Sequence, residues 1–314
     1  MGLMLDILTI VLPVFAVIAL GTLLKRWKLI DPGFVQQTNR LVYYVALPLL
    51  LFFKIGTADF GRNFNAPLVA GSALAVAGIF FLSYGWARLR GYPPACRGSF
   101  SQGSFRGNLA YVGLALCLNA YGEEGLTRAG ILMGFLVPVL NLFAIIALLL
   151  PQKGGAERPE AGFWLRQLAY NPLILASFAG LFWSFFQLPM PAILSRSLQI
   201  ATAMTLPLAL IALGGSFSLA RLKGDLKMAL LASALKLAGL PLLALALLLA
   251  FGVGGTDLGI GLLMAGTPAA TATYIMAHQM KGDAELAGSI VMISTLLSVV
   301  TYSAGLLLLR MAGL

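Results

Sequence analysis

Apolar segments about as long as a membrane is thick follow one another along almost the whole of this chain. Because the bilayer core offers the backbone no hydrogen-bonding partner, a segment of roughly 20 apolar residues crosses it as a helix. Charged residues make up only 10% of the sequence, whereas soluble domains carry about 25%. The pattern predicts an all-α integral membrane protein of ten transmembrane helices with no soluble domain. The approximate ranges are 4–24, 34–56, 66–87, 95–119, 126–150, 170–187, 196–219, 228–251, 257–280 and 286–309.

Prolines and glycines recur in the two halves of the chain at one constant offset. A half with an odd number of spans must insert upside down relative to the other half, and inverted repeats of this kind are typical of secondary transporters. We therefore predict two inverted five-helix repeats, 1–150 and 166–314, joined by a cytoplasmic linker at 151–165, with the substrate site where the halves meet. The recurring residues are Pro13, Gly21, Pro48 and Gly56, matched by Pro172, Gly180, Pro207 and Gly215, and the differences 172−13, 180−21, 207−48 and 215−56 all equal 159.

Basic residues gather in alternate loops. Thirteen Lys and Arg residues lie in the loops that follow the odd-numbered spans, and five lie on the opposite side. Since cytoplasmic loops carry the excess of Lys and Arg, both termini are predicted to face away from the cytoplasm. The net charge of +10 therefore reflects membrane topology rather than nucleic-acid binding, and a bacterial inner membrane is the expected location.

Residues suited to catalysis or metal binding are scarce. All eleven acidic residues lie in loops or at span ends, so we expect no intramembrane carboxylate relay of the kind that proton and sodium pumps use. One histidine and two separated cysteines, Cys96 and Cys117, supply neither a nucleophile–base pair nor metal ligands. We predict no enzyme activity, no metal and no cofactor. A coupling Na⁺ or H⁺ would have to use His278, backbone carbonyls or neutral side chains.

The fourth apolar segment of each half is the most polar and the richest in glycine. The fourth segment contains Gly107 and Gly113, and the ninth contains Gly266 and Pro268, all places where a helix can open. If both helices break at mid-depth, the N-terminal ends of their second halves favour an anion. The alternative is that the glycines are close-packing positions between helices. We favour the break because it falls in matched segments.

Four stretches of sequence resemble a known family. They are LVYYVALPLLLF, GNLAYVGLAL, NPLILASFAG and TPAATATYIMAHQMKGDAELA, and they are similar to segments of the auxin efflux carrier family, whose fold is related to that of the bile-acid symporters. The resemblance implies a membrane transporter of ten helices in inverted repeats, with the fourth and ninth helices crossing as broken helices. By analogy it also implies a homodimer. Bacterial members are assigned to malonate, malate and similar organic acids.

The chain departs from the family pattern at three positions. The family's crossover proline in the fourth helix falls at Ala115, which we expect at the break, and the second crossover proline of plant members falls at about Thr273. Plant auxin exporters carry serine where this chain has Leu51. These departures favour a small carboxylate over an aromatic, auxin-like substrate.

Polar residues near the two expected breaks are the candidates for substrate binding. Arg106 would pair with a carboxylate by a two-pronged contact, or snorkel toward the cytoplasmic surface beside Arg97. Asn108 would cap a half-helix or donate its amide to an anion. His278 would suit proton coupling or lie at the membrane interface, and Lys236 is expected to pack or snorkel. The further candidates, each weighed against a role in helix packing, are Ser104, Tyr111, Asn141, Thr271, Thr273 and Tyr274.

The sequence thus predicts a secondary transporter that moves a small organic anion across the lipid bilayer by alternating access, with its site at the crossing of the fourth and ninth helices. Spans 3–5 and 8–10 would move against spans 1–2 and 6–7. Two alternatives stay open. One is a sodium- or proton-coupled symporter or exchanger of the same fold with a bile-acid-like, neutral or ionic substrate. The other is a membrane receptor that binds a ligand without moving it.

Overall fold

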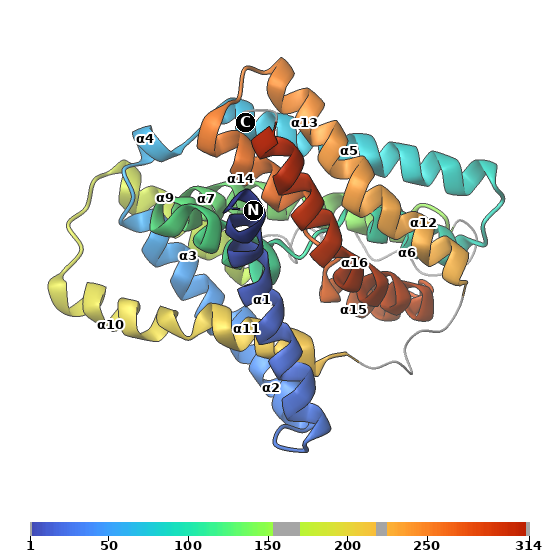
Figure 1. The fold of residues 1–314 in the computed structure, drawn as a ribbon, viewed down its shortest axis with the longest axis horizontal. Helices are drawn as coiled ribbons and strands as arrows, with labels where there is room; N and C mark the ends of the chain where they lie inside the picture. Colours follow the sequence, from blue (N-terminus) through green and yellow to red (C-terminus); the bar gives the residue numbers. More distant parts are fainter. Residues whose placement is uncertain (1, 153–169, 218–224, 312–314) are drawn as a thin grey trace.

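The computed structural model describes residues 2–152, 170–217 and 225–311, and within these ranges the chain is helical, with one isolated antiparallel backbone bridge between Gly107 and Ala269 (Figure 1). Most of the predicted linker 151–165 lies outside the described residues, as do the basic residues that we assigned to loops within 153–169 and 218–224. The first half forms α1 (Gly2–Arg26), α2 (Pro32–Leu41), the π-helical turn η1 (Val42–Ala46), α3 (Leu47–Gly56), α4 (Phe60–Asn63), α5 (Ala66–Leu89), α6 (Pro94–Phe105), the π-helical turn η2 (Leu109–Gly113) and α7 (Leu114–Leu149). The second half forms α9 (Pro172–Phe185), α10 (Ala192–Ala203), α11 (Thr205–Gly215), α12 (Leu226–Ala234), the π-helical turn η4 (Leu235–Gly239), α13 (Leu240–Ala250), α14 (Gly255–Ala265), α15 (Thr271–Gln279) and α16 (Ala284–Met311).

The helices begin at sequence signals that satisfy their free N–H groups. Asn65 precedes α5, and its side chain accepts a hydrogen bond from the Leu68 N–H at 3.0 Å. Asn171 precedes α9 and accepts from the Leu173 N–H at 2.9 Å, with Pro172 at the first helical position. Such caps stabilise a helix end by about 1 kcal/mol, and proline at this position gives up no hydrogen bond. The first residue of each of these helices is therefore determined by its immediate neighbours in the sequence.

Among the described residues, seven helical runs are long and apolar enough to cross a membrane, which makes this an integral membrane protein. The runs are Ile7–Arg26, Pro32–Gly56, Ala66–Leu89, Leu109–Leu149, Ala192–Gly215, Leu226–Ala250 and Ala284–Leu308, and two shorter apolar helices are Pro172–Phe185 and Gly255–Ala265. The run of 41 residues contains Gly122, whose φ of 63° is left-handed and marks the connection between the fourth and fifth predicted segments. Ten spans stay a prediction.

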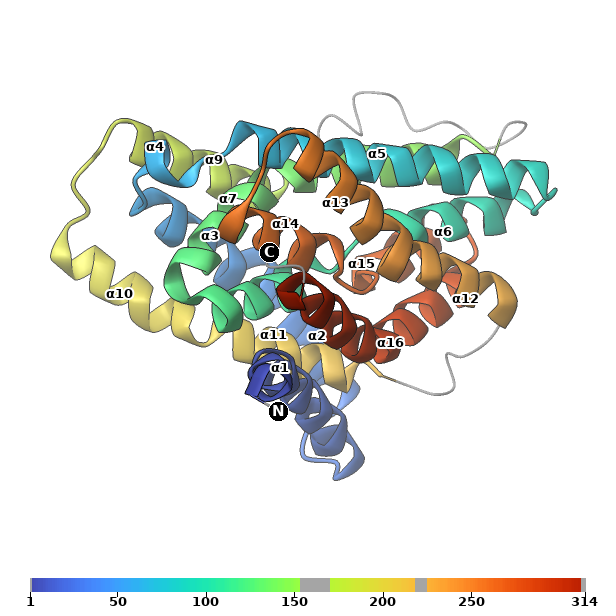
Figure 2. The same cartoon turned by 45° about the horizontal axis from the view of Figure 1, so that its top comes forward.

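Helices from the two halves of the chain pack against each other in two groups. Helix α1 packs against α11, and α3 packs against α9 (Figures 1 and 2). A second group surrounds the interrupted helices, with α5 against α6, α7 and α13, and α16 against α6, α12 and α15. The largest core cluster contains buried apolar side chains of both groups, and two smaller clusters lie within the second group. The arrangement places α6 and α14 inside the second group.

Glycine contacts between the halves repeat at the offset of 159 residues. A Cβ added to Gly21 would lie 2.2 Å from the carbonyl oxygen of Ile211, and one added to Gly180 would lie 3.1 Å from that of Phe52. Both differences, 180−21 and 211−52, equal 159. Glycine is required at Gly21 because only a residue without Cβ lets the two backbones approach this closely.

Candidate functional site

Two helices unwind where they cross, and their unwound backbones pair with each other. Helix α6 ends at Phe105 and η2 begins at Leu109, while α14 ends at Ala265 and α15 begins at Thr271. The Asn108 N–H donates to the Pro268 carbonyl at 2.8 Å, and the Ala270 N–H donates to the Arg106 carbonyl at 3.0 Å. Non-helical backbone at membrane depth survives only where protein or a wet cavity satisfies it, and here each unwound segment satisfies part of the other.

Three of the predicted opening points lie at these interruptions. Gly107 lies in the first unwound segment and Pro268 in the second, and Gly266 caps the end of α14. A Cβ on Gly107 would lie 2.1 Å from the Thr267 hydroxyl oxygen. Gly107 therefore fits both interpretations that the sequence left open, a helix break and a close-packing position. It lies where the helix opens, and it also lies where two segments touch.

The prediction that Gly113 and Ala115 lie at the break is wrong. Gly113 ends η2 with φ −61° and ψ −53°, and Ala115 lies within α7. A Cβ on Gly113 would lie 2.7 Å from the Met264 sulfur and 3.1 Å from a methyl carbon of Thr267. Glycine at this position permits close packing against the end of α14 and its unwound continuation rather than a change of backbone direction.

Arg106 is the first residue of the unwound segment, and its guanidinium bonds inside the helix group. One terminal nitrogen donates to Asn141 Oδ1 at 2.7 Å, and the other lies in contact with the Met276 sulfur. The structure thus brings together two predicted site residues, Arg106 and Asn141, that are 35 positions apart. Neither contact partner is a carboxylate, so the charge of this arginine is not neutralised by them.

Asn108 and Thr273 carry buried polar atoms that lack a partner among the described residues. Their exposed fractions are 5% and 0%. The Asn108 Oδ1 accepts the Tyr111 N–H at 3.3 Å, as a cap of the second half-helix, whereas Asn108 Nδ2 and Thr273 Oγ1 are unpaired within the described ranges. A buried unpaired polar group costs about 1–3 kcal/mol, so a ligand that supplied partners here would recover that energy.

The remaining candidates near η2 have partners elsewhere. The Tyr111 hydroxyl donates to Asn39 Oδ1 at 3.1 Å and so joins η2 to α2. The Ser104 hydroxyl donates to the Phe100 carbonyl of its own helix at 2.8 Å. Asn39 had no place among the sequence candidates, and its position in the polar run 36–40, at the start of a predicted membrane span, was the signal that could have found it.

Helix α15 leads away from the crossing and spreads its polar residues along its length. Thr271 begins the helix beside the unwound segment, and half-buried Tyr274 lies one turn further along. His278 is exposed in the last turn, seven residues or about 10 Å from Thr271, with its ring centroid 6.4 Å from that of Tyr274. The crossing and the only histidine are therefore separate features.

Lys236 is a polar residue at the crossing to which the sequence assigned only packing or snorkelling. It lies in η4, it is fully buried, and its Nζ donates to the Ala265 carbonyl at 2.7 Å. The bond reaches the last residue of α14. A lone lysine in the middle of an apolar segment was the available signal, and snorkelling was the wrong interpretation of it.

A wide cavity of about 930 Å³ opens between helices of both halves, and no residue of the two unwound segments lines it. It is lined by residues of α1, α3, α4, α10 and α11 and by residues of α7, among them Asn119 and Glu123. An ion pair of 2.5 Å between Lys54 Nζ and Glu123 Oε2, two of the lining residues, joins α3 to α7. Exposed pairs of this kind contribute at most about 1 kcal/mol, so the pair does not lock these two helices together.

Comparison with known proteins gives a consistent result. The sequence model of the family described as membrane transport protein matches residues 6–304. A Rhizobium meliloti protein that carries the provisional name malonate transporter is 28% identical over 99% of this chain and 98% of its own length. A protein of Methanothermobacter thermautotrophicus, named an uncharacterized transporter, is 25% identical over 93% of this chain and 94% of its own. Because the family match spans nearly the whole sequence, the chain belongs to the membrane transport protein family, the auxin efflux carrier family that its motifs resemble.

Proposed function

We propose that this protein is a secondary transporter that moves a small organic anion across the membrane by alternating access, with its binding site at the crossing of α6–η2 and α14–α15. The observation that carries the proposal is Arg106, a cation at unwound backbone whose contacts are a neutral amide and a thioether. Arginine in the membrane interior marks a substrate path, and its planar fork fits a carboxylate. The provisional name of the Rhizobium relative supports an organic acid.

Asn108 and Thr273 would complete the site by hydrogen bonding to the carboxylate or to a substrate hydroxyl. Both present a buried polar atom without a partner among the described residues, and they come from the two different broken helices. If one group of helices moved against the other, Asn108 would move with η2 and Thr273 with α15.

Transport and ligand binding are tested together with Asn108→Ala and Thr273→Ala. We expect a small mono- or dicarboxylate to raise the melting temperature of the purified wild-type protein in proportion to ln(1 + [L]/Kd), and each variant to lose about tenfold in uptake, the equivalent of one hydrogen bond to a charged ligand. Ser303→Ala is the control, since its hydroxyl bonds only to the Val299 carbonyl of its own helix at 2.9 Å. Wild-type uptake by both folded variants would remove the crossing from the proposal.

The inverted repeat and the ten spans belong to the same proposal. In a two-fold arrangement, contacts occur in pairs of the form i to j and j to i. The contacts of Gly21 with Ile211 and of Gly180 with Phe52 form such a pair at the offset of 159. The Thr205 hydroxyl donates to the Ala46 carbonyl at 3.3 Å, and these two residues are themselves 159 apart, as expected for residues on the axis. These contacts support two inverted halves built from the same five-helix unit.

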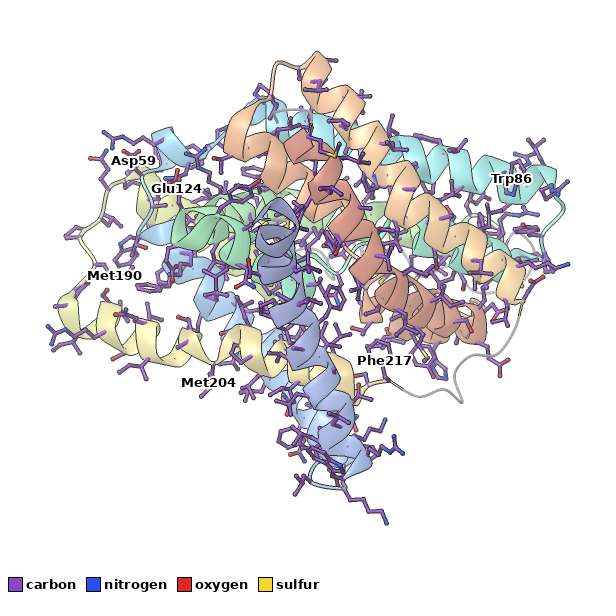
Figure 3. The ribbon with its side chains drawn as sticks, in the orientation of Figure 1. Asp59, Trp86, Glu124, Met190, Met204 and Phe217 are labelled. Atoms are coloured by element: carbon purple, nitrogen blue, oxygen red, sulfur yellow. The ribbon has the colours of Figure 1, made fainter. Side chains whose placement is uncertain are left out.

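The cavity supports one state of alternating access, open on the side away from the cytoplasm. In Figure 3, Asp59, Glu124 and Met190 lie at the left end of the molecule, while Trp86 and Phe217 lie to the right. Asp59 and Glu124 line the cavity, and the excess of basic loops assigns the opposite end to the cytoplasm. On the cytoplasmic side, the hydrogen bond between Tyr111 and Asn39 holds η2 against α2. Both termini would then be non-cytoplasmic, in a bacterial inner membrane.

Cysteine labelling tests this orientation. In a background with Cys96→Ala and Cys117→Ala, Gln199→Cys places a thiol at an exposed position lining the cavity. We expect a membrane-impermeant maleimide added to intact cells to label it at once, whereas Arg88→Cys, exposed in the last turn of α5, reacts only after permeabilisation. The reverse pattern would invert the proposed topology.

A further inference from the structure

Lys236 is a second cation at the crossing, distinct from the arginine proposed to bind substrate. Its side chain is 0% exposed, and its Nζ donates to the carbonyl oxygen of Ala265 at 2.7 Å. Ala265 is the last residue of α14, and Gly266 follows it as the cap. The ammonium therefore sits at the C-terminal end of a half-helix inside the protein.

That end of α14 is a place where a cation is stabilised. The last four carbonyl groups of a helix have no intrahelical donor, and they form the negative end of the helix dipole. In secondary transporters with broken helices, unwound carbonyls and half-helix C-terminal ends hold the coupling Na⁺ or H⁺. The Lys236 ammonium bonds to one of these carbonyls directly.

The surroundings of Lys236 belong to a single group of helices. It lines a small cavity of about 20 Å³ together with Ser72 of α5, Leu136 of α7, Leu240 of α13 and Met264 of α14. A Cβ added to Gly107 would lie 3.3 Å from Lys236 Cε. The lining residues include none from α1, α3, α9 or α11. The ammonium is thus tied to the C-terminal end of α14 and would travel with it.

We propose that the Lys236 ammonium is a tethered cation that takes the place of a coupling sodium ion at the C-terminal end of α14, so that transport by this chain does not require Na⁺. The inference deepens the proposed function, since it concerns whether transport through the same site is coupled to a cation. It rests on that function only in experiments that measure transport. A covalently attached charge neutralises the half-helix end in every state of the cycle, which removes the need to bind a dissociable cation there.

Melting of the purified full-length protein tests the inference without any substrate. Melting temperatures are compared in NaCl and in choline chloride at equal ionic strength. The wild-type protein is expected to melt at the same temperature in both. Lys236→Ala removes the ammonium and leaves space beside the Ala265 carbonyl, so Na⁺ is expected to raise its melting temperature. Lys236→Met fills the space without charge and is expected to show no sodium response.

Two results would overturn the inference. One is a wild-type protein that Na⁺ stabilises relative to choline, because a separate sodium site would then exist. The other is a folded Lys236→Ala variant that melts identically in both salts. Lys236→Ser is the second variant should alanine fail to purify, since it leaves the same space.

Uptake into proteoliposomes provides the second readout. Wild-type uptake of an organic anion such as malonate is expected to be unchanged when choline replaces Na⁺, and to fall at least about tenfold in Lys236→Met, because the half-helix end loses its counter-charge. Wild-type uptake that stops without Na⁺ contradicts the tethered-cation role. If the wild-type protein moves none of the organic anions, the proposed function fails, whereas the melting comparison still decides the role of Lys236.

Discussion

Replacing Arg106 by alanine is expected to lower uptake of the organic anion at least about tenfold, while the protein keeps its helical content and its elution as a single species. Among the described residues the guanidinium bonds to Asn141 and Met276, so its loss removes two bonds inside the protein and the proposed contact with the substrate carboxylate. A hydrogen bond to a charged group contributes about 1.5–3 kcal/mol, which corresponds to a loss in affinity of at least about tenfold. Initial uptake rates and ligand-induced shifts in melting temperature measure the effect.

Two further variants sharpen the interpretation of Arg106→Ala. Arg106→Lys keeps the charge and loses the two-pronged geometry, so it is expected to retain weak uptake with lower affinity. Arg88→Ala removes an exposed arginine at the end of α5 and is expected to behave as wild type. A folded Arg106→Ala protein with unchanged uptake and affinity would exclude this arginine from the substrate site.

Among substitutions that add one methyl group between α1 and α11 or between α3 and α9, Gly214→Ala is expected to be the most destabilising. A Cβ at this position would lie 1.9 Å from the carbonyl oxygen of Ile18 in α1. That atom belongs to backbone, so no side-chain rotation relieves the contact, and α1 and α11 must move apart. Overpacking of well-packed positions costs about 1–3 kcal/mol. We expect a lower melting temperature and a large aggregated fraction on size-exclusion chromatography.

Gly85→Ala is the matched control. Gly85 is also helical, in α5, but a Cβ there meets no atom within 4 Å. Because alanine is a better helix former than glycine by about 1 kcal/mol, this variant is expected to melt at or slightly above the wild-type temperature. Equal melting temperatures for Gly214→Ala and Gly85→Ala would show that close packing of α1 on α11 does not hold the halves together.

The boundaries of the helices were largely predictable from the sequence. The segment predicted at 66–87 is α5, Ala66–Leu89, and the one predicted at 170–187 contains α9, Pro172–Phe185. Apolar length and local caps determine such elements because lipid leaves the backbone no partner outside the helix. The same local rules placed Gly107 and Pro268 at interruptions, since glycine and proline weaken a helix wherever they occur.

The sequence did not show which of the glycines in the fourth segment lies in unwound backbone. Gly107 and Gly113 look alike in the fourth segment, yet only Gly107 lies in the unwound backbone. The difference arises from residues more than 150 positions away, because the N–H of Asn108 and the carbonyl of Arg106 find their partners at Pro268 and Ala270. Gly113 meets Met264 instead and stays helical.

The sequence by itself determined that this chain folds as membrane helices and that two of them carry weak points. Only the tertiary structure decided what half-buried Arg106 and buried Lys236 contact. Arg106 reaches Asn141 on α7 and Lys236 reaches Ala265 at the end of α14. Hydropathy and periodicity are properties of neighbours along the chain, whereas a buried charge is stabilised by dipoles and donors that other helices bring to it. That pairing exists only once the helices have packed.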